Sequence, residues 1–465
     1  MSTEREKQWE NLVREVNALG GNGEDFAAAM KELYSLYDEG VIYWYAGLFD
    51  PEIGGFYFAN SARDAEGYLP DIEATQHCLG FFEKFTGVSN FADVAPDWMK
   101  VSIGKWIKGL QDPNGYFYHP QWDKAFTDTK LARKGRDLNY GLGVMSACGF
   151  NPTYDTPLGG KGDGLLPDGT PVELPVSDTA ANAETKAAPE KKPTLKFSPH
   201  LESAETFRAY LDGLYNDLCT RPYWTGNQFS NQIGQIKARD KMLREAGESE
   251  SLCKMLIDWF NARQNPDTGN WYYPTDDDAK NAPRRFSYEG NNSLLKIIDV
   301  YNQIGAELSY PIEAARSAMK AITAETPASS VCDVYNTWFA VCQVISNIKN
   351  HSSRSEEEKA EYIATIRREL LKDAPTAIRA SKDKIATFKR PDNGFSYTPH
   401  GTSITSQGMP VALPGFDESD TNASAISIGF NRFMYKAFEL TYIKPFDAPL
   451  LEKYLALLEE KRPKQ

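Results

Sequence analysis

The sequence predicts an all-α fold in which outer and inner helices alternate around a ring, an (α/α)6 toroid. Two observations support this prediction. A Pro/Gly turn followed by an aromatic residue recurs along the chain, and charged amphipathic helical patterns alternate with short segments that are apolar on all sides. The length of 465 residues agrees with it, because a chain of this size needs either two domains or one large repeat architecture.

The repeated turn occurs four times. Its proline fixes φ, its aspartate or asparagine folds back onto its own backbone, and its glycine takes the left-handed conformation. We expect the aromatic residue after the glycine to pack the turn against its neighbour. The four copies span residues 50–56, 111–116, 264–271 and 390–395.

Six segments that follow the turns begin with good N-capping residues and continue with small apolar ones, which is typical of buried helices. They start near Pro70, Gly135, Gly226, Glu289, Ser330 and Asp417. The helical segments before the turns are longer and charged, as expected of the outer helices. Examples are residues 96–110, 201–218 and 355–371.

The chain divides into four parts on this interpretation. Residues 1–22 form an N-terminal helix outside the ring, and residues 23–150 form the first part of the toroid. Residues 151–200 are polar and of low complexity, so we expect a long surface insertion there. Residues 201–465 complete the toroid.

The composition excludes several classes of function. A net charge of −13 argues against broad nucleic-acid binding, and no apolar run is long enough for a membrane span. The first residues are charged and lack the apolar core of a secretory signal, which favours a cytoplasmic protein. Six scattered cysteines are expected to be reduced core residues. No His-x-His, Cys-x-x-Cys or His-Glu-x-x-His occurs, so we expect neither a metal nor another cofactor.

The succession of outer helix, Gln-Asp-Pro-Asn-Gly-aromatic turn and inner helix resembles the toroids of polysaccharide lyases and glycoside hydrolases. At the level of the repeat it also resembles terpenoid cyclases and prenyltransferases. The resemblance covers residues 25–445 and concerns architecture, from which function does not follow directly. Residues 417–421 also resemble the Asp-x-Asp-Asp-Thr motif of class II terpenoid cyclases, but Ser419 replaces the central acid.

In such a ring the starts of the inner helices converge on one mouth, so chemistry is expected there. The carboxylates at these starts are candidates for acid–base catalysis, although each also suits a simple helix cap. The catalytic candidates among them are Asp137, Glu289, Asp333 and Asp420, with Asp71, Glu73, Asp417 and Glu418 as further acids.

The same mouth also carries basic and amide side chains. Arginine pairs bidentately with carboxylates, and an amide can help to neutralise a uronate so that its C5 proton becomes acidic. Tyr140 or Tyr288 is the expected base, with His77 in reserve. The expected uronate-binding residues are Arg136, Arg284, Arg285, Asn139, Asn291 and Asn292. All of these side chains could instead serve salt bridges or caps.

Aromatic residues near the turns suit stacking on sugar faces, although about half are expected to be structural. The candidates for substrate binding are Tyr118, Trp122, Trp271 and Tyr273.

Taken together, the sequence predicts an enzyme that degrades an acidic, uronate-containing oligo- or polysaccharide, with β-elimination preferred. A glycoside hydrolase with paired carboxylates is the first alternative, in which Asp137 or Glu289 works with Asp333 or Asp420. A terpenoid-cyclase-like enzyme and a helical scaffold that binds glycan or protein remain further alternatives.

Overall fold

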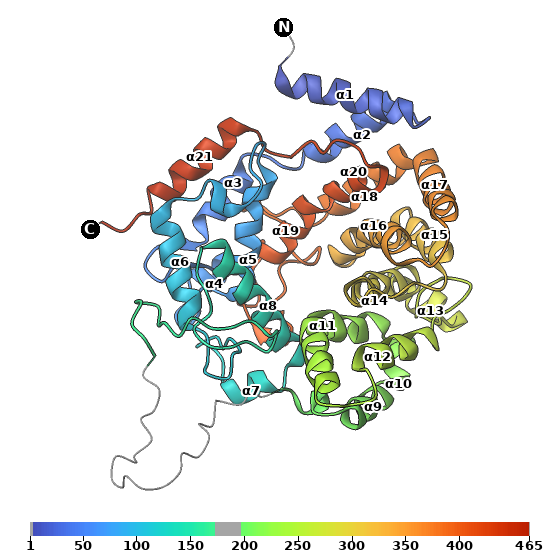
Figure 1. Cartoon of the computed structure of the whole chain (residues 1–465). Helices are drawn as coiled ribbons and strands as arrows, with labels where there is room; N and C mark the ends of the chain where they lie inside the picture. Colours follow the sequence, from blue (N-terminus) through green and yellow to red (C-terminus); the bar gives the residue numbers. More distant parts are fainter. Residues whose placement is uncertain (1–2, 173–196, 465) are drawn as a thin grey trace, which may run out of the picture.

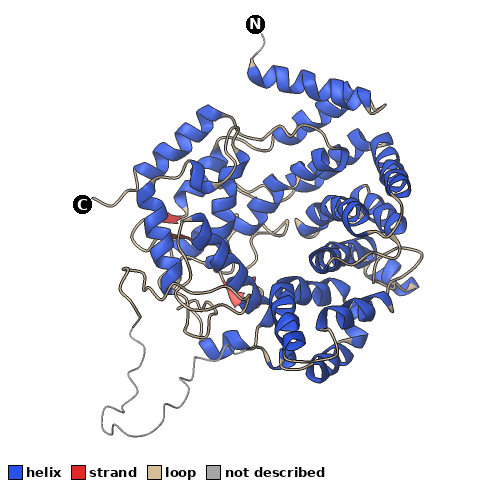
Figure 2. Ribbon diagram, in the orientation of Figure 1, coloured by secondary structure: helices blue, strands red, loops and turns tan. Residues whose placement is uncertain are grey.

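The computed structural model describes residues 3–172 and 197–464, and within them the chain is almost entirely helical (Figure 2). The expected all-α class is confirmed. Within these ranges the strands form only two short hairpins. The strands are β1 (Phe49–Asp50) with β2 (Gly55–Phe56), and β3 (Thr405–Ser406) with β4 (Met409–Pro410). Residues 173–196 of the expected insertion lie outside the described residues.

Six helices contact one another in cyclic order: each packs on the next in the chain, and the last packs on the first. Figure 1 shows them arranged around a common centre. They are α5 (Ile72–Phe81), α8 (Leu131–Ala147), α11 (Pro222–Glu245), α14 (Gly290–Ile304), α16 (Cys332–His351) and α19 (Thr421–Gly429). The buried faces of these inner helices carry small and apolar residues, as the sequence indicates.

The other helices pack against these six or against one another: α6 packs on α8, α12 on α11, α15 on α14 and α16, and α17 and α18 on α16. At the N-terminus, α1 packs on α2, which packs on α18. The longer ones are α1 (Glu4–Ala18), α2 (Gly23–Tyr34), α3 (Gly40–Gly47), α6 (Asp97–Gly109), α9 (Ala204–Gly213), α12 (Leu252–Asn261), α15 (Pro311–Ile322), α17 (Glu356–Lys372), α18 (Ala374–Ala386), α20 (Asn431–Phe438) and α21 (Ala448–Glu459). Short helices are α4 (Asn60–Arg63), α7 (Lys124–Asp128), α10 (Tyr215–Thr220) and α13 (Asp276–Asn281), with single turns η1 (Phe82–Lys84), η2 (Phe91–Asp93), η3 (Pro199–Leu201) and the π-turn η4 (Arg285–Glu289).

Of the inner helices, α5, α14 and α16 begin within two residues of the expected starts, whereas α19 begins at Thr421, four residues after Asp417. Asp71 and Asp420 cap α5 and α19 through hydrogen bonds from the backbone N–H groups of the third residue beyond, at 2.8 and 2.7 Å. By contrast, α8 begins at Leu131 and α11 at Pro222, four residues before the expected starts. Asp137 therefore lies in the second turn of α8 rather than at its N-terminal end.

The four turns form as expected, with one difference. Gly54, Gly115 and Gly269 have φ of +94°, +86° and +66°, the left-handed conformation that glycine adopts without strain. In the fourth turn Asn393 takes this conformation, with φ of 77°. Gly394 is needed for a different reason, because a Cβ there would lie 2.6 Å from the Cβ of Ser419.

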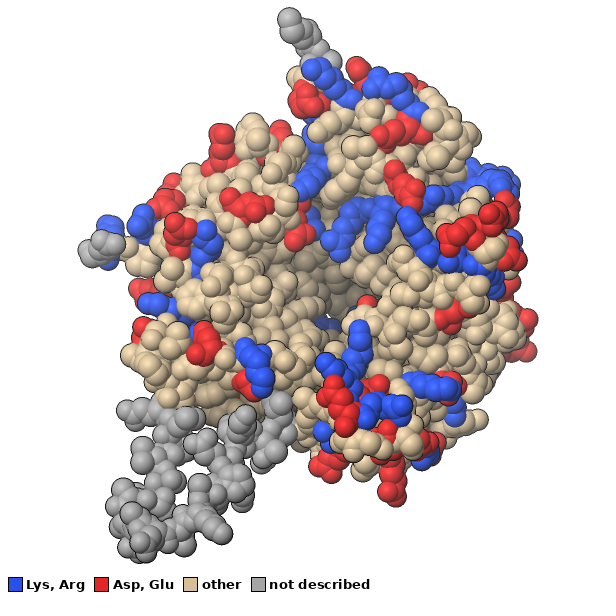
Figure 3. Space-filling view, in the orientation of Figure 1, with Lys and Arg blue, Asp and Glu red and all other residues tan. Residues whose placement is uncertain are grey.

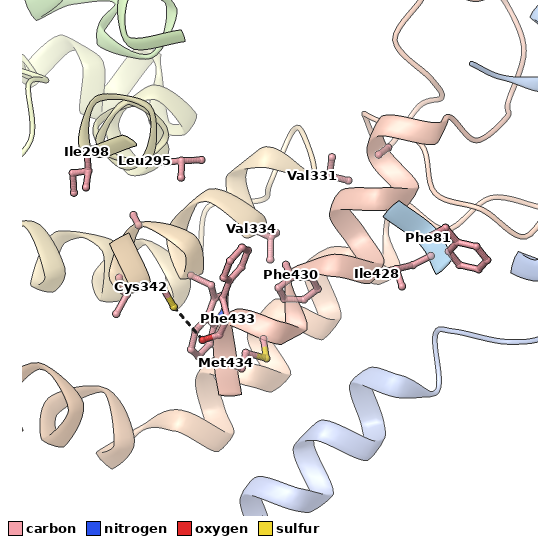
Figure 4. Close-up of a cluster of buried hydrophobic side chains, with 14 of the residues drawn as sticks. Phe81, Leu295, Ile298, Val331, Val334, Cys342, Ile428, Phe430, Phe433 and Met434 are labelled. Carbon is pink, nitrogen blue, oxygen red and sulfur yellow. Dashed lines mark hydrogen bonds between the residues drawn. The ribbon is translucent and has the colours of Figure 1, made fainter. Parts of the chain in front are cut away.

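The aromatic residues that follow the turns are packed inside the protein. Phe56, Tyr116, Trp271 and Phe395 have no exposed surface, which agrees with a structural role for the repeated aromatic position. Figure 4 shows part of the same apolar core between α14, α16, α19 and α20. There the Cys342 thiol donates a hydrogen bond to the Phe433 carbonyl over 3.3 Å, and the rings of Phe339 and Phe433 stack at 4.2 Å.

Within the described ranges, no helix combines the length and apolar character that crossing a membrane would require. The six cysteines are all free thiols.

Candidate functional site

A cavity of about 250 Å³, here called the central cavity, lies between α5, α8, α16, α19 and α20. Figure 3 shows the centre of the molecule hollowed on the face in view. The polar and titratable residues that line the cavity are Gln76, His77, Glu83, Lys84, Tyr140, Tyr335 and Arg432. Apolar residues such as Phe81, Ile426 and Ile428 form the rest of its wall. It lies beside the C-terminal halves of α5 and α19, and Tyr335 in the first turn of α16 also lines it.

Two cations line this cavity without a carboxylate partner. Neither Lys84 nor Arg432 forms an ion pair within the described residues. Lys84 is 8% exposed, and burial, with the nearby charge of Arg432, lowers its pKa to about 8. Glu83 is the one acid in the lining, so the wall is net basic. An anionic ligand would therefore offset the cost of burying Lys84.

His77 and Tyr140 lie side by side on the cavity wall. Their rings meet edge to face with centroids 5.7 Å apart. His77 Nε2 is buried and has no hydrogen-bond partner in the described structure, and the nearest carboxylate oxygen, Glu73 Oε1, is 3.6 Å away. Burial raises the pKa of Tyr140 in spite of the nearby Arg136, so the phenol keeps its proton at neutral pH.

A buried cluster of charges, the carboxylate cluster, adjoins His77 on α5 and α8. It consists of Asp71, Glu73, Arg133, Arg136 and Asp137. Arg133 bonds to Asp137 at 2.9 Å, to Asp71 at 2.6 Å and to Glu73 at 3.2 Å. Arg136 also donates to Glu73. The uronate-binding candidate Arg136 is thus already paired.

Two guanidinium groups face three carboxyls in the carboxylate cluster, which leaves one negative charge in excess. Burial raises the pKa of Asp137 to about 7 against the pull of Arg133. Burial would raise the pKa of Glu73 as well, but Arg136, His77 and Arg133 hold it well below its usual range. Around neutral pH, Glu73 is therefore ionised and Asp137 can hold a proton.

A second set of predicted residues, the Asp333 cluster, consists of Arg284, Asn292 and Asp333. Arg284 binds both oxygens of the fully buried Asp333 at 3.1 and 2.9 Å, and the Asn292 amide donates to it at 2.8 Å. The backbone N–H of Ser329 adds a fourth bond at 2.9 Å. This carboxylate is fully satisfied by protein groups. Nearby, Glu289 accepts a bond from the Tyr223 backbone at 3.1 Å, and burial raises its pKa.

Other predicted residues lie away from the central cavity. Tyr288 is fully buried and its hydroxyl donates to the Thr326 carbonyl. The Arg285 guanidinium donates a hydrogen bond to the Thr220 carbonyl, and its other terminal nitrogen lies 3.7 Å from the Asp278 carboxylate. Asn291 lines a separate small pocket beside Tyr272 and Phe286, whereas Asn139 donates to the Asn231 carbonyl at 3.3 Å.

The aromatic candidates are also dispersed. Among the described residues, none of them lines the central cavity. Trp271 is fully buried and donates its indole N–H to the Phe260 carbonyl at 2.9 Å. Trp122 covers the Arg133 guanidinium at 4.4 Å. The Tyr118 hydroxyl donates to Asp128 at 2.7 Å, and Tyr273 is exposed at the surface.

In the acidic segment before α19, residues 417–420, each carboxylate has a partner within the protein. Asp417 pairs with Arg390 at 2.9 Å, and Glu418 accepts from the Ser61 backbone at 2.8 Å. Ser419 donates its hydroxyl to Asp392 at 2.5 Å within the fourth turn. Asp420 caps α19 and accepts from the Thr402 hydroxyl at 2.7 Å, and burial raises its pKa to about 7.

Sequence reasoning missed the two cations of the cavity. Lys84 follows α5 in an apolar run, and Arg432 is the second residue of α20. A cation within an apolar run such as Phe81-Phe82-Glu83-Lys84-Phe85 is the signal that indicates Lys84. The predicted candidates lie at the starts of the inner helices, whereas Lys84 and Arg432 lie just beyond the C-terminal ends of α5 and α19.

No group of three or more His, Cys, Asp or Glu side chains within residues 3–172 and 197–464 is arranged to hold a metal ion. No family model matches the chain, and comparisons with curated proteins and with solved structures return no match either. The functional proposal therefore depends on the geometry of the cavity.

Proposed function

We propose that this chain is an (α/α)6-toroid enzyme that cleaves a uronate-containing oligosaccharide by β-elimination in the central cavity. The observation that carries the proposal is the combination of two cations without carboxylate partners, Lys84 and Arg432, with His77 and Tyr140 in contact on the same wall. The cyclic contacts of the six inner helices, with other helices packed around them, support the toroid.

The acidic substrate follows from the charge of the wall. β-Elimination requires the carboxylate of the sugar to be neutralised, since only then is the adjacent C5 proton acidic enough to leave. Lys84 supplies that charge from a buried position, where electrostatic interactions are stronger than in bulk water, and the exposed Arg432 adds a second positive charge at the cavity. A neutral sugar would leave both cations uncompensated.

The proton transfers are assigned to His77 and Tyr140. The imidazole of His77 removes the C5 proton, the released electron pair forms the C4–C5 double bond, and the C4–O bond breaks. The leaving oxygen takes the proton of the Tyr140 phenol. The sequence favoured Tyr140 or Tyr288 as the base, with His77 in reserve, but the raised pKa of Tyr140 suits it better to the role of acid.

Glu73 is a positioning residue in this scheme. It lies one helical turn before His77 on α5, and its carboxylate, held ionised by Arg136, stabilises the imidazolium that forms. Glu73→Gln is expected to lower kcat while leaving KM for the oligouronide unchanged, in protein whose fold is checked by circular dichroism.

The proposal is tested by incubating the protein with oligouronides and following the absorbance of unsaturated product together with new reducing ends. Both signals should rise in parallel, and neutral oligosaccharides should give neither. Tyr140→Phe should lower the rate by about 10²–10⁴-fold. Tyr288→Phe is the matched control, because it removes the hydroxyl of a buried tyrosine outside the cavity. Equal loss in the two variants would contradict the assignment.

Glycoside hydrolysis is the second candidate, favoured by the two buried acids whose pKa is raised to about 7, Asp137 and Asp420. A protonated carboxyl can act as a general acid in hydrolysis. In this case reducing ends should appear without unsaturated product. Asp137→Asn or Asp420→Asn, rather than Tyr140→Phe, should then abolish turnover.

A further inference from the structure

Residues 397–410, here called the cover segment, run across the N-terminal ends of the inner helices. The Tyr397 carbonyl accepts from the Val331 backbone at the start of α16 at 3.2 Å. The Thr402 hydroxyl donates to Asp420, the cap of α19. The Ser406 hydroxyl donates to Glu73 on α5, and the Asn227 amide of α11 donates to the Gln407 side chain at 2.8 Å. One segment thus links four of the six inner helices at this end.

The tip of the cover segment is anchored firmly. It is the β3–β4 hairpin, in which Ser406 pairs with Met409 and the turn residue Gln407 has φ of 51°. Met409 is fully buried in a small apolar cluster that includes Phe58, Ala74 and Trp122. The Trp122 indole N–H donates to the Pro410 carbonyl at 3.3 Å. A hairpin held by both packing and hydrogen bonds forms a fixed wall.

The hairpin tip is separated from the cavity wall by a single residue. Glu73 accepts a bond from Ser406 on one side and lies 3.6 Å from His77 on the other. The cavity itself lies beside the C-terminal halves of α5 and α19, where Lys84 and Arg432 line it. The cover segment therefore lies across the N-terminal ends of α5, α11, α16 and α19, on the far side of Glu73 from His77 and the cavity.

From this arrangement we infer that the site takes the end of an oligouronide chain and releases short products, with the β3–β4 hairpin as the stop. The inference rests on the proposed function and adds the mode of attack. A chain bound through its middle needs a groove that is open at both ends. The cavity of about 250 Å³ lies below the roughly 300–1,000 Å³ of pockets for drug-sized ligands, which suits one or two sugar residues.

The test is a binding titration of the Tyr140→Phe variant, which is expected to turn over slowly, with four forms of one hexauronide: untagged, tagged with a bulky fluorophore at either end, and tagged at both ends. Calorimetry, with the untagged chain as competitor for the tagged ones, gives each Kd. We expect one singly tagged form to bind like the untagged chain. The doubly tagged form should bind more weakly by about tenfold or more, because neither of its ends can enter.

Two results would overturn the inference, and they are distinguishable. Binding of the doubly tagged chain within about twofold of the untagged one would show that the chain binds through its middle, while the proposed acidic ligand would stand. Failure of all four forms to bind would overturn the acidic-oligosaccharide function together with end-on entry. The size of the released products gives an independent check, since end-on attack predicts mono- or disaccharides from the first turnovers.

Discussion

The central cavity and the Asp333 cluster contain the same kinds of side chain but differ in how fully those side chains are paired. Arg284 is held by both oxygens of Asp333, which also accepts from Asn292 and from the backbone. Arg432 and Lys84 have no carboxylate partner within the described residues, and they line an open space. The comparison teaches that a charge already paired with a buried counter-charge indicates structure, whereas cations without a carboxylate partner beside a cavity indicate an anionic ligand.

The largest effect is expected at His77. His77→Gln should lower kcat/KM for an oligouronide by about 10²–10⁴-fold, because the base that removes the C5 proton is lost. His200→Gln is the matched control, since His200 bonds to Gln232 at 2.9 Å and does not line the cavity. Steady-state rates of unsaturated-product formation measure both variants. If His77→Gln kept the wild-type rate, His77 would not be the base, and the central cavity would have no catalytic role that the Asp333 cluster lacks.

The comparison is sharpened by removing one arginine from each region and measuring stability. Arg284→Ala should lower the free energy of unfolding by about 2–3 kcal/mol, because the buried Asp333 loses its counter-charge. Arg432→Ala should change it by less than about 1 kcal/mol, because no ion pair is broken. Urea unfolding followed by circular dichroism gives both values. The reverse order of effects would show that Arg432 is structural and Arg284 is not.

The pH dependence of ligand binding tests the charge of Lys84. Its pKa of about 8 means that the ammonium form prevails at pH 7 and is lost as the pH rises through 8. The Kd for a uronate should therefore rise by about tenfold between pH 7 and pH 9. Lys84→Arg is the control, because a guanidinium stays charged over this range and should keep the affinity constant. A wild-type Kd that does not change with pH would exclude Lys84 from binding.

A separate effect, on stability rather than on ligand binding, is expected from the acid that caps α19. The pKa of Asp420 is raised in the folded state to about 7, so the folded protein binds a proton that the unfolded chain has released between about pH 4 and 7. The free energy of unfolding should fall as the pH rises through this window. Asp420→Asn should flatten part of that slope, with Asp137 accounting for the remainder. Urea unfolding at pH 5 and pH 8 measures the difference, and an unchanged slope in the variant would contradict it.

Much of the fold follows from local sequence, because helices and turns depend on neighbouring residues. The four Pro/Gly turns, the buried aromatic positions and the caps at Asp71 and Asp420 could all be predicted in this way. Even here, sequence assigned the left-handed position of the fourth turn to Gly394 rather than Asn393. The side chain of asparagine tolerates this conformation, so the glycine was not needed for it.

The site depends on contacts between distant parts of the chain, which local patterns do not reveal. Lys84 and Arg432 meet because α19 packs on α5, far apart in sequence. Sequence also cannot show whether an arginine is already paired. Arg136 and Arg284 were predicted to bind substrate from their position in basic loops, and the structure joins each to a buried carboxylate. Of the predicted catalytic residues, the structure brings His77 and Tyr140 together on the cavity wall.

The central claim is that the unpaired cations of the cavity select an acidic ligand, and calorimetry with matched sugars tests it most directly. Glucuronate and glucose differ in the carboxylate alone. The wild-type protein should bind glucuronate and not glucose, and the double variant Lys84→Met with Arg432→Met should lose glucuronate binding while remaining folded. Equal binding of the two sugars, or unchanged glucuronate binding in the double variant, would contradict the account.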